Sequence, residues 1–263
     1  MKAQNYRALV EYDGTDYAGF QIQPDRLTVQ GQLEKALQRA TQEFVRVHAA
    51  GRTDAGVHAY GQVITFRSSW RHGTPVLQRA MNALLPADIA VRQLSVALES
   101  FHARFSATSR EYIYNLCIGS VRRPMVERYV HRLPSWPDLA AMERAADLLL
   151  GEHDFAAFGH APSGNNTVRV VRHAEWRRRS EETDGWPGSL GDSGLSFRIE
   201  ATGFLRGMVR RIVGTLLTVG MGALGVDDFA GVLASADLAQ AVPSAPARGL
   251  CLWGVRYDPD GQG

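Results

Sequence analysis

The sequence is poor in the features that hold disulfides, structural metals and membranes. Its 263 residues contain two cysteines, Cys117 and Cys251, which form neither a disulfide framework nor a zinc motif. No apolar run approaches the ~20 residues that a membrane-spanning helix requires, and the N-terminus has no signal-peptide apolar core. We therefore expect a cytoplasmic chain without a bound metal and without membrane contact.

Motifs of energy-driven and zinc chemistry are also missing. The sequence has no GxxxxGK phosphate-binding loop and no HExxH helix. His153, Asp154 and His160 are conceivable metal ligands, but their neighbours Phe155 and Phe158 favour a packed loop. The sequence therefore implies neither nucleotide energy nor a metal, and no cofactor is expected.

Lysine is scarce as well, because 27 of the 29 basic residues are arginine. A GC-rich genome explains that ratio without a functional reason, and a formal net charge of +2 is too small to indicate a nucleic-acid partner by itself. Their distribution is more informative. Residues 104–132 hold six arginines against two acids, and Arg206, Arg210 and Arg211 follow with no acid nearby. Local positive fields of this kind suit phosphate contacts.

The most informative motif is AGRTDAGVHA, residues 50–59, which places Asp54 between two glycines with Arg52 two positions before it. A nearby cation favours the charged form of an acid, so Asp54 should stay ionised and can act as a nucleophile. The alternative is that Asp54 only caps the turn. Residues two apart in an extended segment project to one side, so Arg52 and Asp54 should point the same way, unless Arg52 forms a turn-stabilising ion pair. His58 is expected to hold the turn through a backbone hydrogen bond.

The first half of the chain predicts the order strand, helix, strand, strand, helix, strand. Strands are expected at residues 6–13, 45–50, 60–67 and 89–96. Apolar residues from Val29 to Phe44 recur at helical spacing, with Thr28 as the N-cap. The second helix, residues 75–85, is expected to bury Leu77, Met81 and Leu84. This is the order of a ferredoxin-like α+β unit.

The second half predicts the same order again. Strands are expected at residues 110–118, 168–178, 195–201 and 250–257, and helices at 138–150 and 205–219. Residues 180–193 are expected to form a hairpin connection. We therefore predict two domains, residues 1–103 with the Asp54 turn and residues 104–263 with Tyr112 and an arginine-rich helix.

Two groups of polar side chains in the second half are candidate site residues. Alternation along the predicted strand puts Tyr112 and Tyr114 on one face, and a place in the core fits Tyr114 better than Tyr112. Arg206 and Arg210 are four residues apart, so they should share one helix face, while Met208, Ile212 and Leu216 mark the buried side. A solvated basic face is the alternative for the two arginines.

Five ordered blocks of sequence resemble the TruA-type tRNA pseudouridine synthase family. They are YDGTDYAGFQIQ with TVQGQLEKAL, AGRTDAGVHA, FHARFSATSREYIYNL, FLRGMVRRIVGTLLTVGMG and APARGLCLWGVRY. Two departures are Phe20, where the family's tryptophan is expected, and the long polar stretch 180–193. The resemblance implies two ferredoxin-like units with antiparallel sheets side by side and a basic cleft across them.

The same resemblance implies the reaction and its partners. A uridine at position 38, 39 or 40 of the tRNA anticodon stem-loop would be isomerised to pseudouridine, without a cofactor, by a homodimer that also contacts the tRNA elbow. Asp54 matches the family's catalytic aspartate and Tyr112 its active-site tyrosine. Either Arg210 or Arg206 would pair with Asp54, and Arg210 is preferred because it lies in the core of the MVRRIVG segment.

The chemistry adds a role for Arg52 and leaves the route open. The target nucleotide must leave a stacked stem, and the planar guanidinium of Arg52 could occupy the vacated space. Asp54 could attack C1′, attack C6, or abstract a sugar proton to give a glycal. Two other functions compete: an RNA chaperone, which would not need Asp54, and a nucleoside hydrolase, which would need a second acid.

Overall fold

The computed structural model describes residues 3–161, 164–179 and 193–258. The fold mixes β-strands with five α-helices in these ranges. The chain divides into two compact units: Met1–Arg110 with Leu252–Gly263, and Glu111–Cys251. Strands β5 (Ala107–Ile118) and β10 (Leu250–Tyr257) cross the boundary between the units. None of the described helices is both long and apolar enough to cross a bilayer.

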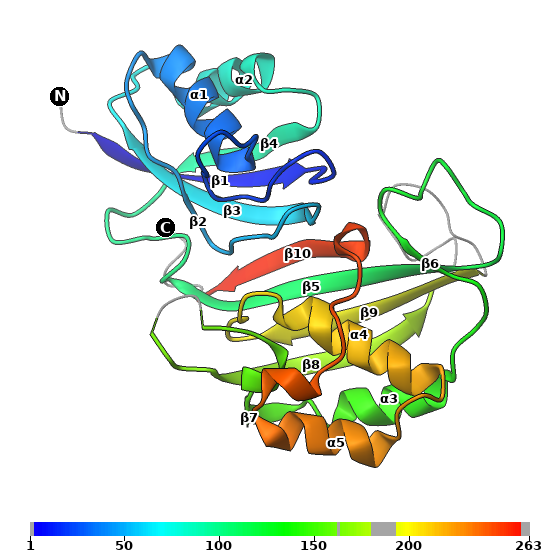
Figure 1. Ribbon diagram of the computed structural model, residues 1–263. Helices are drawn as coiled ribbons and strands as arrows, with labels where there is room; N and C mark the ends of the chain where they lie inside the picture. The colour runs from blue at the N-terminus through cyan, green and yellow to red at the C-terminus, as the bar shows by residue number, and fades with distance from the viewer. Residues whose placement is uncertain (1–2, 162–163, 180–192, 259–263) are drawn as a thin grey trace. The chain divides into compact units, whose positions relative to one another are not determined.

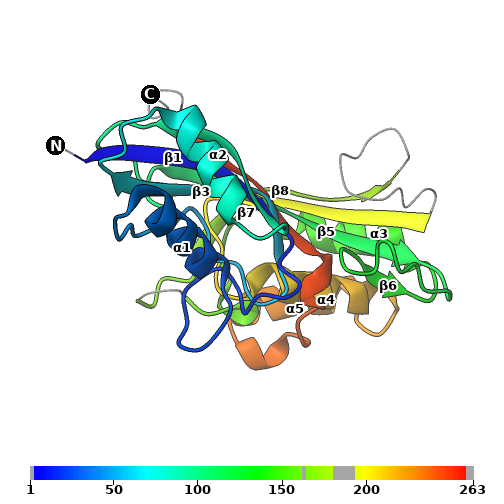
Figure 2. The same cartoon turned by 90° about the horizontal axis from the view of Figure 1, so that it is seen from above.

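The first unit follows the predicted order of strands and helices. Its elements are β1 (Gln4–Tyr12), α1 (Val29–Thr41), β2 (His48–Ala49), β3 (His58–Ser68), α2 (Thr74–Leu84) and β4 (Ile89–Val96). The strands lie in the order β4-β1-β3, β2 pairs with β3, and each of these pairs is antiparallel. Both helices lie on one side of these strands and contact each other (Figures 1 and 2).

Helix α1 begins where the sequence predicts and ends earlier. The Thr28 hydroxyl accepts a hydrogen bond from the Gly31 N–H at 3.3 Å, as expected of an N-cap. The helix stops at Thr41 because Gln42 adopts a left-handed conformation. Phe44 therefore lies beyond the helix and its place on the buried face is wrong.

The core of the first unit covers both faces of β3. Ile64 and Phe66 are buried on one face, and Val63 on the other packs with Phe101 and Tyr257. In α2, Leu77 and Met81 are fully buried as predicted, whereas Leu84 in its last turn is half-buried.

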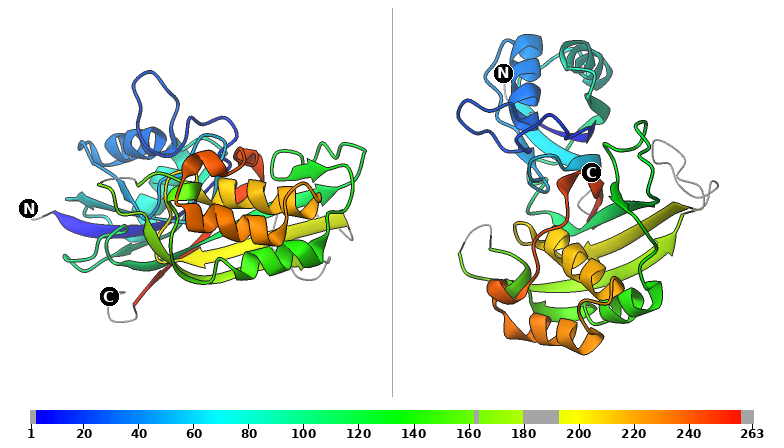
Figure 3. Two further views of the ribbon diagram at one scale, coloured as in Figure 1. Left: turned by 60° about the horizontal axis from the view of Figure 1, so that its bottom comes forward. Right: turned by 45° about the vertical axis from the view of Figure 1, so that its right-hand side comes forward.

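The second unit contains three elements that the sequence analysis missed. It holds β6 (His131–Leu133), α3 (Leu139–Asp147), β7 (Gly151–Asp154), β8 (Val168–Arg178), β9 (Gly194–Ala201), α4 (Met208–Gly220) and α5 (Val226–Ser235). The strand order is β5-β9-β8-β7. Strands β7, β8 and β9 pair antiparallel, whereas β6 pairs in parallel with β5. Helices α3, α4 and α5 pack against one another (Figure 3). The missed elements are β6, β7 and α5.

Two further expectations concern this unit. Met208, Ile212 and Leu216 are fully buried, so the predicted buried side of α4 is confirmed. The predicted start at residue 205 is wrong, because Gly207 is a left-handed N-cap and the helix begins at Met208. The hairpin expected over residues 180–193 falls, apart from Ser193, outside the described residues.

Candidate active site

Asp54 lies in the loop that joins β2 to β3. The Val57 N–H donates to the Asp54 carbonyl at 3.2 Å and closes a turn. Before that turn, burial alternates as in any extended segment: Arg52 is exposed, Thr53 is buried and Asp54 is half-buried. The loop thus presents the Arg52 guanidinium and part of Asp54 to solvent.

A second segment, between β1 and α1, is hydrogen-bonded to this loop. The Phe20 N–H donates to the Thr53 carbonyl at 3.0 Å, and the Gly56 N–H donates to the Tyr17 carbonyl at 3.3 Å. The buried hydroxyls of Tyr12 and Thr53 are hydrogen-bonded at 2.7 Å. The residues on either side of Asp54 are therefore held in place by hydrogen bonds to β1 and to the segment that follows it.

The two segments approach so closely that glycine is required at two positions. A Cβ atom at Gly14 would lie 2.0 Å from the Val57 carbonyl oxygen. A Cβ atom at Gly19 would lie 2.8 Å from the Thr53 carbonyl oxygen, and Gly19 has φ of +103°. These contacts give a physical reason for both glycines of the YDGTDYAGF block.

His58 stabilises the base of the loop. Its Nδ1 lies 3.1 Å from the Gly14 N–H and also 3.1 Å from Asp13 Oδ1. One ring nitrogen cannot accept from the first and donate to the second, and Asp13 Oδ1 already accepts from the Thr15 N–H and hydroxyl. We therefore assign Nδ1 as the acceptor from Gly14, the backbone hydrogen bond that the sequence predicts.

The first residues of the loop are fixed by two polar side chains, the buried Gln62 and the half-buried Arg110. Gln62 is fully buried in β3 and bonds both the N–H and the carbonyl of Gly51, at 3.3 and 2.7 Å. The Arg110 guanidinium donates to the Ala50 carbonyl through Nε at 3.2 Å and Nη2 at 3.1 Å. Both ends of the loop are thus anchored within the first unit.

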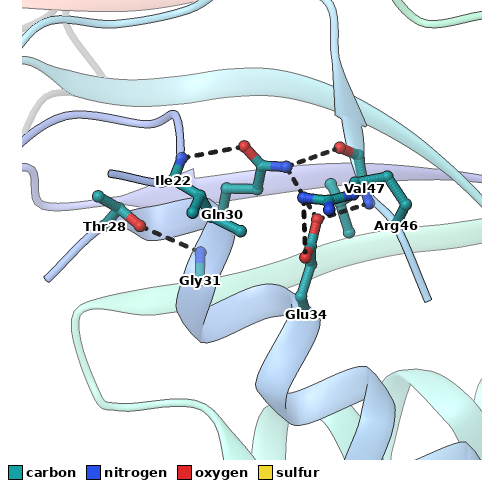
Figure 4. A network of polar contacts seen from close by, with 7 residues as sticks. All are labelled: Ile22, Thr28, Gln30, Gly31, Glu34, Arg46 and Val47. Atoms are coloured by element: carbon teal, nitrogen blue, oxygen red, sulfur yellow. Dashed lines mark hydrogen bonds and ion pairs between the residues drawn. The ribbon is translucent and has the colours of Figure 1, made fainter. Parts of the chain in front are cut away.

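Helix α1 links the segment before it, at Ile22, to the segment before β2, at Val47, through a buried polar network (Figure 4). The Gln30 amide accepts from the Ile22 N–H at 3.2 Å and donates to the Val47 carbonyl at 3.2 Å. Glu34 accepts from the Gln30 amide at 2.8 Å and from the Val47 N–H at 3.0 Å. Its other oxygen lies 3.5 Å from the Arg46 guanidinium, so the buried carboxylate is paired.

In the second unit, Tyr112 and Tyr114 are both buried in β5 but have different neighbours. Tyr112 contacts the Phe204 ring edge to face, with centroids 5.1 Å apart. Tyr114 donates its hydroxyl proton to the Pro246 carbonyl at 2.8 Å, and burial raises its pKa above the usual value. Tyr114 is therefore a core residue, while Tyr112 lies beside the segment that precedes α4.

The two candidate arginines are not on one helix face. Arg206 lies before the helix, where its N–H donates to the His160 carbonyl at 2.9 Å, and its side chain is exposed. Arg210 lies in the first turn of α4. Its guanidinium donates to the Ala245 carbonyl at 2.8 Å, and the Ala245 N–H returns a bond to the Arg210 carbonyl at 2.9 Å. The predicted shared face of Arg206 and Arg210 is wrong.

The candidate residues are divided between the two units. Arg52 and Asp54 belong to the first unit, and Tyr112, Arg206 and Arg210 belong to the second. The pairing of Asp54 with Arg206 or Arg210 stays a prediction.

Two of the three conceivable metal ligands, His153 and Asp154, are hydrogen-bonded to backbone groups. His153 Nε2 lies 2.9 Å from the Leu150 carbonyl, and Asp154 accepts from the Ala156 N–H at 2.9 Å. Among the described residues, no three histidine, cysteine or acidic side chains come together as a metal site.

Several supporting residues escaped the sequence analysis. Gln62 is a polar residue beside the apolar Val63 and Ile64 in β3, and Gln30 and Glu34 lie on the buried side of the amphipathic helix α1. Such residues need buried partners, so their positions were a usable signal.

Comparison with known proteins identifies the class of this site. A family model described as tRNA pseudouridine synthase matches residues 8–106 and 145–258, and the chain belongs to this family. It is therefore an RNA-modifying isomerase, and the resemblance drawn from the five sequence blocks is confirmed.

Its relatives are named alike. A tRNA pseudouridine synthase A of Chloroflexus aurantiacus is 46% identical over 257 residues, which cover 95% of this chain and 88% of the relative. Those of Roseiflexus castenholzii and Anoxybacillus flavithermus are 42% and 41% identical, covering 98% and 96% of this chain and 92% and 98% of the relatives.

Proposed function

We propose that this chain converts uridine to pseudouridine at positions 38, 39 and 40 of the tRNA anticodon stem-loop, with Asp54 as the catalytic residue. The N1–C1′ bond breaks, the uracil turns, and a C5–C1′ bond forms while the C5 proton is lost and N1 gains one. The atoms balance without a cofactor. The observation that carries the proposal is the Asp54 loop, whose flanking backbone is bonded at Gly51, Thr53 and Gly56.

The roles of the other residues follow from their chemistry. Tyr112 is proposed to stack on the extruded uracil and to serve the proton transfer at C5. Arg52, exposed two residues before Asp54, is proposed to occupy the space that the uridine leaves. Arg210, or Arg206, is proposed to pair with Asp54. Attack at C1′, attack at C6 and the glycal route all stay open for Asp54.

The finer architecture and the assembly belong to the same proposal. The strand orders support a ferredoxin-like topology for each unit. They are β4-β1-β3, with β2 paired to β3, in the first unit and β5-β9-β8 in the second. We propose a cytoplasmic homodimer in which one tRNA contacts both subunits, including through its elbow. The assignment of the catalytic turn to residues 1–103, and of Tyr112 with the arginine-rich helix to 104–263, stays a prediction. The placement of the units side by side and the basic cleft stay predictions too.

The test is release of tritium from an unmodified tRNA transcript labelled at C5 of uridine. The parent chain should release tritium without added nucleotide. Asp54→Asn should release none while its tRNA affinity stays within several-fold, because the amide keeps the shape but removes the negative charge. Asp25→Asn, at an exposed position, is the matched control and should behave like the parent. Activity of Asp54→Asn near the parent rate would refute the role of Asp54, and free uracil as product would favour a hydrolase.

A further inference from the structure

A short turn in the first unit holds a phenylalanine in solvent. Phe105 is 76% exposed. The turn that carries it is closed by hydrogen bonds from the Ser106 N–H to the His102 carbonyl and from the His102 N–H to the Ser106 hydroxyl, both 3.0 Å long. His102 Nδ1 also accepts from the Arg104 N–H at 3.1 Å. The exposure of Phe105 is therefore imposed by an ordered turn.

The same turn is anchored to the sheet below it. The N–H of the fully buried Ala103 donates to the Thr65 hydroxyl at 3.3 Å, and the Tyr257 hydroxyl donates to the Ala103 carbonyl at 2.9 Å. Burial is the favourable state for a phenylalanine ring, so a fixed and exposed one is a candidate contact for another molecule.

A second exposed phenylalanine precedes the Asp54 loop. Phe44 is 72% exposed, and the next outward-facing residues of the segment are Arg46 and His48. They alternate with the buried Val45 and Val47. The chain length allows at most about 35 Å between the Cα atoms of Phe44 and Asp54.

Ring contacts join the two exposed phenylalanines into one surface. The His48 and His102 rings lie 5.2 Å apart, and the His102 and Phe105 rings lie 4.5 Å apart. The Arg46 guanidinium lies 5.5 Å from the Phe44 ring, and that of Arg104 lies 5.5 Å from the Phe105 ring. We call these six residues the aromatic–basic strip; they are Phe44, Arg46, His48, His102, Arg104 and Phe105.

The positive charge of the strip favours one kind of binding partner over another. Glu34 is buried against Val47 and Gln30, with its second oxygen 3.5 Å from the Arg46 guanidinium, and Glu43 bonds Ser68 and Ser69. The strip presents to solvent two phenyl rings, the Arg46 side chain, which is 52% exposed, and part of the half-buried Arg104. If two copies of this chain met symmetrically through their strips, the arginines of one copy would face the arginines of the other and repel them. A polyanion with stackable bases fits them better.

We propose that the aromatic–basic strip binds an RNA strand outside the Asp54 loop, with bases stacked on Phe44 and Phe105 and phosphates contacted by Arg46 and Arg104. This inference rests on the proposed function, because it gives the tRNA substrate a second contact on the first unit. The contact contributes affinity and does not take part in the chemical step.

The test compares tRNA binding with turnover for the same variants. The double variant Phe44→Ala/Phe105→Ala should raise the Kd for an unmodified tRNA transcript about tenfold or more, with kcat at saturating tRNA unchanged. Phe44→Tyr/Phe105→Tyr should restore the affinity. Arg46→Gln should lower the slope of log K against log salt by about 0.7 to 0.9, whereas the alanine pair should leave that slope unchanged. Val96→Ala and Arg79→Ala, at exposed positions elsewhere in the unit, are the controls.

Unchanged Kd values in both the alanine pair and Arg46→Gln would overturn the proposal. Dissociation of a dimer by the alanine pair in sedimentation, with monomer affinity for tRNA unchanged, would overturn it in favour of a second copy as the occupant. If the alanine pair unfolds, Arg46→Gln and the tyrosine pair still decide the outcome. A parent chain that binds tRNA but releases no tritium would contradict the proposed function alone, since the binding measurements do not depend on turnover.

Discussion

The side-chain amide of Gln62 forms hydrogen bonds with both backbone polar groups of Gly51, three residues before Asp54. Each bond replaces one that water would otherwise make, because Gln62 has no exposed surface. Gln62 therefore fixes the start of the Asp54 loop against β3, next to the point where Arg110 bonds Ala50.

Replacing this glutamine by leucine should damage both stability and turnover. Gln62→Leu leaves the Gly51 N–H and carbonyl without their bonds, at about 1–3 kcal/mol of unfolding free energy for each buried group. The single-turnover rate should fall as well, because the loop loses its fixed start. Urea unfolding and tritium release measure the two effects. Gln78→Leu, which removes one exposed hydrogen bond from α2 to the Arg92 carbonyl of β4, should change stability by less than about 0.5 kcal/mol. Equal effects of the two variants would contradict the role of Gln62.

Arg52 should matter most when the target uridine is paired. If its guanidinium fills the vacated space, Arg52→Ala should slow conversion of a native stem-loop about 10- to 100-fold, since extrusion costs a few kcal/mol. The defect should shrink on a substrate whose target is unpaired. Single-turnover rates on the two substrates make the comparison, with Arg79→Ala as the control. Equal defects on both would show that Arg52 instead acts on Asp54.

The arginines outside the Asp54 loop should set the salt dependence of tRNA binding. Arg128 is exposed in the loop after β5, and Arg211 lies partly exposed in α4. If each contacts a phosphate, Arg128→Ala and Arg211→Ala should each lower the slope of log K against log salt by about 1. Filter binding at several salt concentrations measures this slope. A parent affinity that does not change with salt would contradict the prediction.

His131 should make the stability of the protein fall in weak acid. Burial lowers the pKa of His131 below 6.5, and the neighbouring Arg248 and Arg132 lower it further against the opposing effect of Glu127. A depressed folded-state pKa contributes stability that is present above the unfolded value of about 6.5 and is lost as the pH falls below it. Urea unfolding at several pH values should therefore show a loss of stability that His131→Phe reduces.

His102 is a second histidine that should contribute to this pH dependence. Its pKa is also lowered, first by burial and then by His48 and Arg104. Part of the pH dependence should thus persist in His131→Phe, and replacing His102 as well should reduce it further. A pH profile identical in the parent and the double variant would contradict both assignments.

The elements that the sequence predicts correctly are those whose ends are set by neighbouring residues, such as a capping side chain or a proline. Thr28 marks the start of α1 through its own hydroxyl, and Pro86 follows the end of α2. Asp54 could be selected because its motif is contiguous. The three residues of β6 could not be found in this way, since a strand that short is defined by its partner β5.

The errors have equally specific causes. Phe44 continues the helical spacing of α1, but spacing does not show that Gln42 has already ended the helix. Arg206 has the right spacing from Arg210, yet Gly207 separates it from α4 by a left-handed residue. Gln62 and Arg110 reach the loop from positions distant in the sequence, so their role required three-dimensional contacts.

The division of the chain has a consequence for the order in which its parts can fold during synthesis. The second unit is one continuous stretch, Glu111–Cys251, whereas the first needs the segment from Leu252 onward. Tyr257, near the end of that segment, packs on Phe101 and bonds Ala103. On the ribosome, the residues of the first unit that precede Glu111 must therefore wait for a segment that is made only after the whole second unit, whereas the second unit can fold without that segment.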